Sequence, residues 1–282
     1  MTDILNEITA RRLQDIELKT VTVAELKSRH RDRDGFRSFR RALQTRDEGR
    51  GTREGARDEY SLPSPLVPHP SPLIIAEIKR GSPAKGLFAP DLDPAECAKT
   101  YERGGAACLS VLTEPHWFFG SMDDLVAARN ACSLPVLQKD FVVTEYQVCE
   151  AAVYADCMLL IARCLERQQL ADLYGLATEL GLDVLVEVFD EEDIDKIEPF
   201  NFPLIGINHR NLRTMQIDLE RSKELISRFT PDQTIVAASG IKTRDDIDTL
   251  MQIGMRTFLV GESLSTSPDR VTLLKKLVGF RL

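Results

Sequence analysis

The segment LIIAEIKRGSP, residues 73–83, begins as a buried strand is expected to begin and then changes character. Its first four residues are apolar, whereas Glu77, Lys79 and Arg80 follow within the next positions. Because side chains alternate between the two faces of a strand, Glu77 and Lys79 project from the same face. The segment therefore predicts a hydrophobic strand that ends either in a structural ion pair or in part of a reactive site.

Short apolar runs of the same kind recur through the rest of the sequence, and segments with helical patterns separate them. This recurrence, at intervals of roughly 20–35 residues, predicts right-handed βαβ units and a parallel sheet. After residues 73–79, the predicted strands are 107–111, 135–139, 157–161, 183–187, 204–208, 234–239 and 257–261. Capping residues support the helices, with Asp93, Ser121 and Thr243 at their starts and Gly104, Gly181 and Gly254 at their ends.

Eight strand–helix units in about 210 residues predict an α/β protein with the (β/α)8 TIM barrel fold. A doubly wound open sheet is the alternative architecture. That fold normally carries a glycine-rich dinucleotide loop after its first strand. The first strand here ends in Glu-Ile-Lys instead, which favours the barrel.

The segment before the barrel divides into two parts. Residues 1–44 place Ile4, Leu5 and Ile8 at helix-like intervals and predict an N-terminal helical extension. Residues 45–72 mix charged residues with glycine and then proline, which is typical of a solvated linker. The expected organisation is thus the extension 1–44, the linker 45–72 and a catalytic barrel over 73–282.

The composition and net charge of the sequence disfavour several classes of binding partner. A net charge of −8 disfavours a nucleic-acid binder, since such proteins usually present a basic surface. No apolar run approaches the roughly 18 residues that cross a bilayer, and the N-terminus lacks the pattern of a secretory signal. Six cysteines without a CxxC pair predict reduced thiols in a cytoplasmic protein, and the four histidines show no metal-binding spacing. We expect a small-molecule substrate and no metal, nucleic acid or membrane partner; monomer and homodimer both remain open.

In barrels of this kind, functional residues gather at the C-terminal ends of the strands. Any single polar residue there is more simply explained as a strand-end ion pair or cap. Six such residues on one rim instead predict a shared reactive pocket. These candidates are Glu77, Lys79, Lys139, Glu187, Asn208 and Arg210.

The last two predicted strands carry a different signal. They end in Ser239-Gly240 and Gly261-Glu262, and glycines allow backbone N–H groups to approach a ligand closely. The loops after the seventh and eighth strands form the phosphate site of many barrels. Together with the cationic candidates, this pattern predicts a substrate that carries a phosphate and at least one further negative charge. Acids and lysines enclosed together shift each other's pKa values, which separates general acid from general base.

The candidate residues lie within or beside eight short motifs of the sequence. In chain order these are AEIKRGSPAKG, LSVLTEPHWFFGS, VLQKDFVVTEYQV, LLIA, LVEVF, IGINHRNL, ASGI and FLVGESL. In this order and spacing they resemble the indole-3-glycerol-phosphate synthase family, from about residue 73 to the C-terminus, with a weaker match in the N-terminal helices. The resemblance implies a barrel with an N-terminal helical extension, and no cofactor. It also implies ring closure of 1-(2-carboxyphenylamino)-1-deoxyribulose 5-phosphate, with loss of CO2 and water, in tryptophan biosynthesis.

The resemblance also implies roles for the candidate residues. Lys139 is expected to be the general acid that protonates the ketone, and Lys79 to hold the carboxylate. Glu187 is expected to act as base or acid in dehydration, with Glu77 orienting the lysines. The remaining candidates are substrate-binding (Asn208, Arg210, Ser82 and Ser239) or phosphate-binding (Gly240, Gly261 and Glu262).

The sequence departs from the family pattern in places. Ala238 stands where a glutamate usually precedes Ser-Gly-Ile, Phe189 where a histidine is common and Ala84 where a serine is frequent. Two alternatives therefore stay open. One is another phosphate-binding barrel enzyme, such as a sugar-phosphate isomerase or a Schiff-base aldolase. The other is a catalytically altered paralogue that acts as a phosphosugar-binding or scaffold protein.

Overall fold

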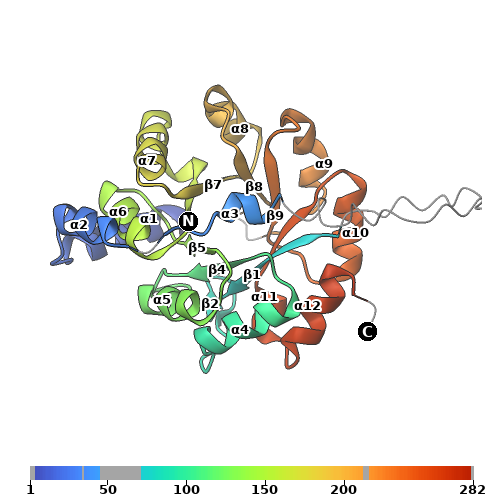
Figure 1. Ribbon diagram of the computed structural model, residues 1–282. Helices are drawn as coiled ribbons and strands as arrows, with labels where there is room; N and C mark the ends of the chain where they lie inside the picture. Colours follow the sequence, from blue (N-terminus) through green and yellow to red (C-terminus); the bar gives the residue numbers. More distant parts are fainter. Residues whose placement is uncertain (1–3, 34, 45–70, 212–215, 281–282) are drawn as a thin grey trace, which may run out of the picture.

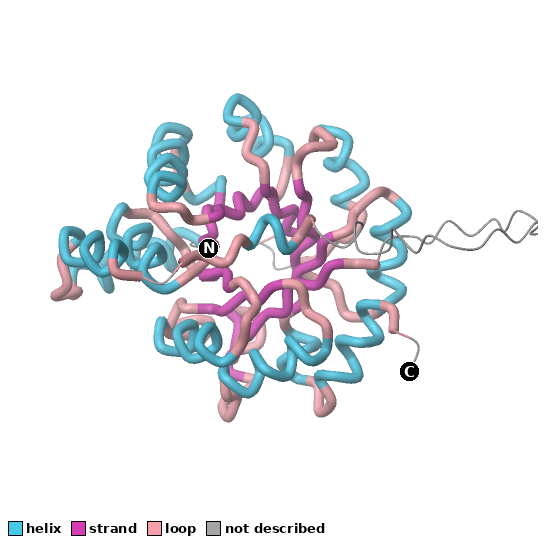
Figure 2. The backbone as a smooth tube through the Cα atoms, viewed as in Figure 1, coloured by secondary structure: helices cyan, strands magenta, loops and turns pink. Residues whose placement is uncertain are grey.

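The computed structural model describes residues 4–33, 35–44, 71–211 and 216–280. At its centre, eight parallel strands form a closed barrel in the ring order β1-β10-β9-β8-β7-β6-β5-β4, with helices outside it (Figures 1 and 2). The predicted (β/α)8 barrel is thereby confirmed. The strands are β1 (Leu73–Ile78), β4 (Cys108–Leu112), β5 (Val136–Lys139), β6 (Cys157–Ile161), β7 (Asp183–Val188), β8 (Leu204–Asn208), β9 (Thr234–Ala238) and β10 (Thr257–Val260).

Each predicted apolar run corresponds to one barrel strand, with ends that agree to within a residue. The ring closes where β1 pairs with both of its neighbours, Leu73 lying opposite Thr257 and Ile75 opposite Cys108. Ser239 lies just past β9 because its φ of 67° is left-handed and cannot continue a strand. Strand alternation sends one set of apolar side chains into the barrel and the other toward the helices.

The helices that surround the barrel begin at the predicted caps. The side chains of Asp93, Ser121 and Thr243 accept hydrogen bonds from backbone N–H groups in the first turns of α4, α5 and α10. The outer helices are α4 (Pro94–Gly104), α5 (Met122–Ala131), α6 (Glu145–Tyr154), α7 (Arg167–Glu179), α8 (Glu191–Ile197), α9 (Arg221–Leu225), α10 (Arg244–Gln252), α11 (Glu262–Thr266) and α12 (Arg270–Val278). A short hairpin, β2 (Gly81–Ser82) with β3 (Gly86–Leu87), follows β1, and 3-10 turns lie at Ala162–Cys164, Glu198–Phe200 and Ile226–Arg228.

The helix predicted to end at Gly104 does end there, since α4 is Pro94–Gly104, but the left-handed residue is the next one. Gly105, with φ of 91°, takes the left-handed position after α4, whereas Gly104 is the last helical residue. A larger residue at position 104 is disfavoured for a steric reason, because a Cβ there would lie 2.8 Å from Cδ2 of Leu274 in α12. Gly181 and Gly254 do take left-handed conformations just beyond α7 and α10.

The described part of the N-terminal extension contains three helices, α1 (Ile4–Glu17), α2 (Val23–Arg31) and α3 (Phe39–Ala42). Leu5 and Ile8 of α1 line a cavity at the C-terminal ends of the strands. At the opposite end, Phe39 of α3 is fully buried, and the neighbouring Arg40 N–H donates to Asp183, the first residue of β7. Figure 1 shows α3 in front of the ring of strands. The extension therefore covers both ends of the barrel. Most of the predicted linker, residues 45–70, lies outside the described residues.

A buried ion pair attaches α1 beside the cavity. Arg12 donates two hydrogen bonds of 2.9 Å to the carboxylate of Asp140, which directly follows β5. Thr113 also donates to this carboxylate, at 2.6 Å. A bidentate arginine–carboxylate contact holds both groups in one geometry, so it fixes α1 relative to the end of β5.

Candidate active site

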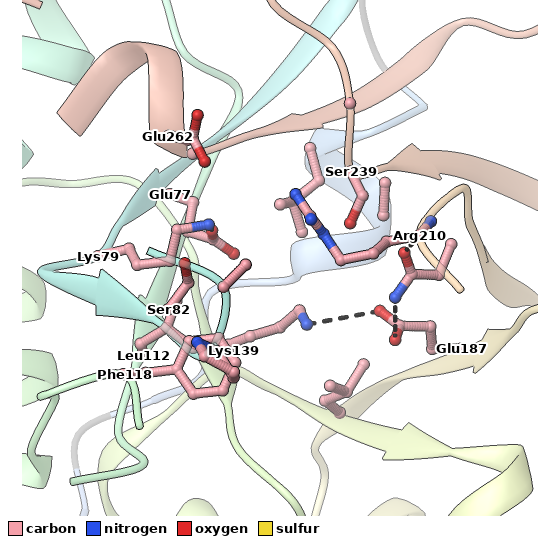
Figure 3. A pocket seen from close by; sticks show the side chains of 18 of the residues that line it. Glu77, Lys79, Ser82, Leu112, Phe118, Lys139, Glu187, Arg210, Ser239 and Glu262 are labelled. Atoms are coloured by element: carbon pink, nitrogen blue, oxygen red, sulfur yellow. Dashed lines mark hydrogen bonds and ion pairs between the residues drawn. The ribbon is translucent and has the colours of Figure 1, made fainter. Parts of the chain in front are cut away.

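A cavity of about 220 Å³ lies where the C-terminal ends of the strands meet (Figure 3). Its lining comes from all eight barrel strands and from α1. All the candidate site residues predicted from the sequence line this one cavity: Glu77, Lys79, Ser82, Lys139, Glu187, Asn208, Arg210, Ser239, Gly240, Gly261 and Glu262. Their placement agrees with the expectation that parallel strands bring their ends to one rim; their individual roles stay predictions.

Glu77 and Lys79 form one charged pair of the cavity. Lys79 Nζ lies 2.7 Å from Glu77 Oε1, and Ser110 Oγ lies 3.5 Å from the second carboxylate oxygen. Glu77 is only 4% exposed. Gly261 borders the same carboxylate, since a Cβ at Gly261 would lie 2.2 Å from Glu77 Oε1. The ion pair predicted from strand alternation therefore exists, and it lies inside the cavity.

Lys139 and Glu187 form a second charged pair. Lys139 Nζ lies 3.4 Å from Glu187 Oε2, and Asn208 Nδ2 donates to Glu187 Oε1 at 2.9 Å (Figure 3). Burial lowers the pKa of Lys139, but the negative charges of Glu187 and Glu77 outweigh it and raise this pKa above its ordinary value. Lys139 is therefore held as a cation in the cavity, able to donate a proton to a group whose basicity rises during a reaction.

The two pairs lie on different sides of the cavity. Figure 3 shows Glu77 and Lys79 on one side and Glu187 on the other, with Lys139 reaching across toward Glu187. A molecule in the space between them would contact a cation and an acid at each side. Such an arrangement can bind an anion, donate one proton and accept another without a change of position.

From the sequence, the glycines at the ends of β9 and β10 were explained by the close approach of a ligand. The structure gives a different physical reason for them. Gly240 has φ of 83°, and a Cβ there would lie 2.5 Å from Cγ2 of Ile217. Gly261 is required by the carboxylate of Glu77, as described above. Both glycines are thus explained by contacts within the chain, and a ligand is not needed to account for them.

Glu262, at the start of α11, forms an ion pair across the mouth of the cavity. Lys85 Nζ, from the β2–β3 hairpin, lies 2.6 Å from Glu262 Oε1. Burial acts to raise the pKa of Glu262, but the hydrogen bond and charge of Lys85, with the charges of Lys79 and Arg210, lower it below its ordinary value. Lys85 and Lys242 also line the cavity, and the sequence analysis did not single them out.

An apolar wall is the second feature that the sequence analysis missed. Ile8, Leu112, Phe118 and Phe141 line the cavity, and the two phenyl rings are tilted with centroids 6.1 Å apart. Such residues carry no charged or polar signal at a strand end. The motif LSVLTEPHWFFGS could have suggested Phe118 alone, through its density of aromatic residues.

Among the residues that the structure describes, no group of histidine, cysteine, aspartate or glutamate is arranged to hold a metal ion. None of the described helices is long and apolar enough to cross a bilayer.

The model of the family "Indole-3-glycerol phosphate synthase" matches residues 52–277. The chain belongs to this family. The resemblance seen in the eight motifs is thereby confirmed.

A curated indole-3-glycerol phosphate synthase, from Desulfosudis oleivorans, is 44% identical over 281 residues, which cover 99% of each chain. A solved structure with a similar fold is the thiamine phosphate pyrophosphorylase from Pyrococcus furiosus. It has a TM-score of 0.54 and 14% identity, and the match covers 73% of this chain and 93% of that one. At this identity the likeness extends to the fold alone.

The departures from the indole-3-glycerol phosphate synthase pattern fall in two places. Ala238 and Ala84, expected from the resemblance to stand in place of a glutamate and a serine, both line the cavity. Phe189 lies outside the lining, with the guanidinium groups of Arg163 and Arg221 each 4.7 Å from its ring centroid. The charged pairs Glu77–Lys79 and Lys139–Glu187 are present beside these changes.

Proposed function

We propose that this protein is an indole-3-glycerol-phosphate synthase that acts in tryptophan biosynthesis. Its reaction closes the ring of 1-(2-carboxyphenylamino)-1-deoxyribulose 5-phosphate and releases CO2 and water, which makes it a decarboxylating carbon–carbon lyase. The observation that carries the proposal is the pair of lysine–glutamate contacts, Lys79–Glu77 and Lys139–Glu187, within one cavity. We propose no cofactor, because each step needs only proton transfer and charge stabilisation.

In the first step, the ring carbon that bears the carboxylate attacks the ketone carbon of the sugar. Negative charge then develops on the ketone oxygen and positive charge on the ring and its nitrogen. Lys139 donates a proton to that oxygen as the carbon–carbon bond forms. Its raised pKa keeps it protonated at neutral pH, so the proton is available when the oxygen becomes basic.

In the second step, the carbon–carbon bond to the carboxylate breaks, CO2 leaves and the electron pair restores the aromatic ring. Lys79 binds the carboxylate until it departs, and Glu77, which contacts Lys79 at 2.7 Å, orients the ammonium group. In the last step the new hydroxyl leaves as water and a proton leaves the ring system. Glu187, held by Asn208 at 2.9 Å, takes part in this proton transfer.

The phosphate lies at the ends of β9 and β10 in this proposal. Ser239, Gly240, Gly261 and Glu262 border that end of the cavity, and Arg210 and Ser82 also line it. Lys85 neutralises the charge of Glu262, and without this contact the carboxylate would repel a phosphate.

A Schiff-base aldolase on the same fold requires a neutral lysine as nucleophile. The raised pKa of Lys139 opposes that role. A catalytically altered paralogue is the second candidate, and the observation behind it is Ala238 in the cavity wall.

The test is to mix the purified protein with 1-(2-carboxyphenylamino)-1-deoxyribulose 5-phosphate and to follow the fluorescence of the indole product. We expect turnover without added metal or cofactor. Binding of this compound without turnover would indicate the altered paralogue, and no binding would indicate another phosphate-binding barrel enzyme.

A further inference from the structure

Glu114, in the loop between β4 and α5, is a fully buried carboxylate that does not line the cavity. It accepts hydrogen bonds from three successive backbone N–H groups, those of His116 at 2.9 Å, Trp117 at 2.7 Å and Phe118 at 3.0 Å. A buried N–H group without an acceptor costs about 1–3 kcal/mol. The carboxylate therefore provides the main polar contacts that hold this loop in its conformation.

The loop is tightly closed around this carboxylate. The N–H of Gly120 donates to the backbone oxygen of Glu114 at 2.9 Å, and Phe119 takes a left-handed φ of 57°. A Cβ at Gly120 would lie 2.0 Å from the backbone oxygen of Leu112. These contacts bring the two ends of the loop together, while its N–H groups bind Glu114.

The closed loop presents one aromatic side chain to the cavity. Phe118 lines the cavity (Figure 3), and its ring packs against that of Phe141. Trp117 and Phe118 both pack against the apolar cluster inside the barrel. The backbone N–H groups of Trp117 and Phe118 are two of the three groups that Glu114 binds, so the position of the phenyl wall depends directly on this carboxylate.

We infer that Glu114 is a positioning residue for the aromatic ring of the substrate, which it controls through the loop and Phe118. The inference rests on the proposed function, because the substrate of that reaction carries a benzoate ring that needs an apolar wall. A ring contact of this kind contributes about 0.5–1.5 kcal/mol of binding free energy. Displacing Phe118 should therefore weaken substrate binding more than it slows the chemical step.

The test is Glu114→Gln, which replaces one acceptor oxygen by an NH2 donor that cannot bind a backbone N–H. We expect KM to rise about three- to tenfold, with kcat changed less than KM. Trp117 is the only tryptophan in the sequence, so its fluorescence reports on this loop without a label. In the variant without substrate, we expect emission at longer wavelength and stronger quenching by acrylamide.

The matched control is Asp183→Asn, which removes a carboxylate that accepts the N–H of Arg40 at the opposite end of the barrel. It should lower the melting temperature without changing KM or the Trp117 emission. Unchanged KM in an active Glu114→Gln protein overturns the inference, as does an equal rise of KM in the control. Absence of turnover in the unaltered protein instead overturns the proposed function, and the Trp117 measurements then still decide whether Glu114 holds the loop.

Discussion

The two lysines at the ends of β1 and β5 have different partners, and these partners define what each side chain can do. Lys79 contacts Glu77 at 2.7 Å, within its own strand end, whereas Lys139 reaches Glu187 from another strand at 3.4 Å. The shorter contact suits a cation that binds an anionic group in a fixed position. The longer contact leaves Lys139 freer to approach a substrate oxygen.

Replacing Lys139 by methionine keeps the volume of the side chain and removes its proton. We expect turnover to fall by about 10²–10⁴-fold, which is the usual contribution of a general acid. The measurement is kcat, with circular dichroism to show that the fold is intact. Near-normal ring closure by Lys139→Met would mean that another group is the general acid.

The raised pKa of Lys139 also predicts how stability depends on pH. Because the folded-state pKa lies above that of the unfolded chain, the contact contributes fully below about pH 10.4, the ordinary lysine value. Its contribution is lost as pH rises through the higher folded-state pKa. The free energy of unfolding in urea should therefore differ between wild type and Lys139→Met by a constant amount at neutral pH. A difference that shrinks already below pH 9 would contradict a raised pKa.

Gly261 offers a direct test of how Glu77 is held. A Cβ at this position would lie 2.2 Å from Glu77 Oε1, while the φ of −122° is accessible to any residue. Gly261→Ala should therefore act by displacing Glu77 and with it Lys79. We expect kcat to fall by about 10²-fold, as small misplacements in an active site can cause.

Gly175→Ala is the matched control for this substitution. Gly175 lies within α7 and has open space around its position. Alanine there should stabilise the protein by about 0.5–1 kcal/mol and leave kcat unchanged, because glycine is unfavourable inside a helix. If Gly261→Ala also keeps full activity, the contact with Glu77 is not important for catalysis.

At the scale of elements, α1 is a wall of the cavity that belongs to the N-terminal extension. Its attachment combines apolar packing of Leu5 and Ile8 with the buried contact between Arg12 and Asp140. Because Asp140 directly follows Lys139, the same contact ties the wall to the segment that carries the proposed general acid. The extension and the barrel are therefore expected to act as one catalytic unit.

Arg11 and Arg12 are adjacent in α1. Replacing each by leucine shows whether the contact with Asp140 matters beyond the loss of one positive charge. Arg12→Leu leaves Asp140 buried without its cation and should lower the free energy of unfolding by about 3–5 kcal/mol. Arg11, which contacts Asp15 with a side chain that is 48% exposed, should cost at most about 1 kcal/mol when changed to leucine. Urea unfolding measures both, and KM should rise only in the Arg12 variant. Equal effects of the two substitutions would show that Asp140 does not anchor α1.

At the scale of the whole molecule, the closed ring explains why residues from distant segments meet. Each barrel strand runs in the same direction, so every strand end that the sequence marks with a charged residue reaches the same rim. Glu77 and Glu187 come from strands separated by three others in one direction around the ring, β4, β5 and β6. Their approach to one cavity depends on closure, and an open sheet would keep them apart.

The sequence by itself determined the strands, the barrel and the list of polar residues at its rim. These follow from local information, namely apolar periodicity, helix caps and the alternation of side chains along a strand. It did not reveal that Glu187 is the partner of Lys139, that Gly261 makes room for Glu77, or that α1 and Phe118 form the apolar wall. Only the tertiary structure decided these points, because they depend on strand register and barrel closure, which set distances between residues far apart in the chain.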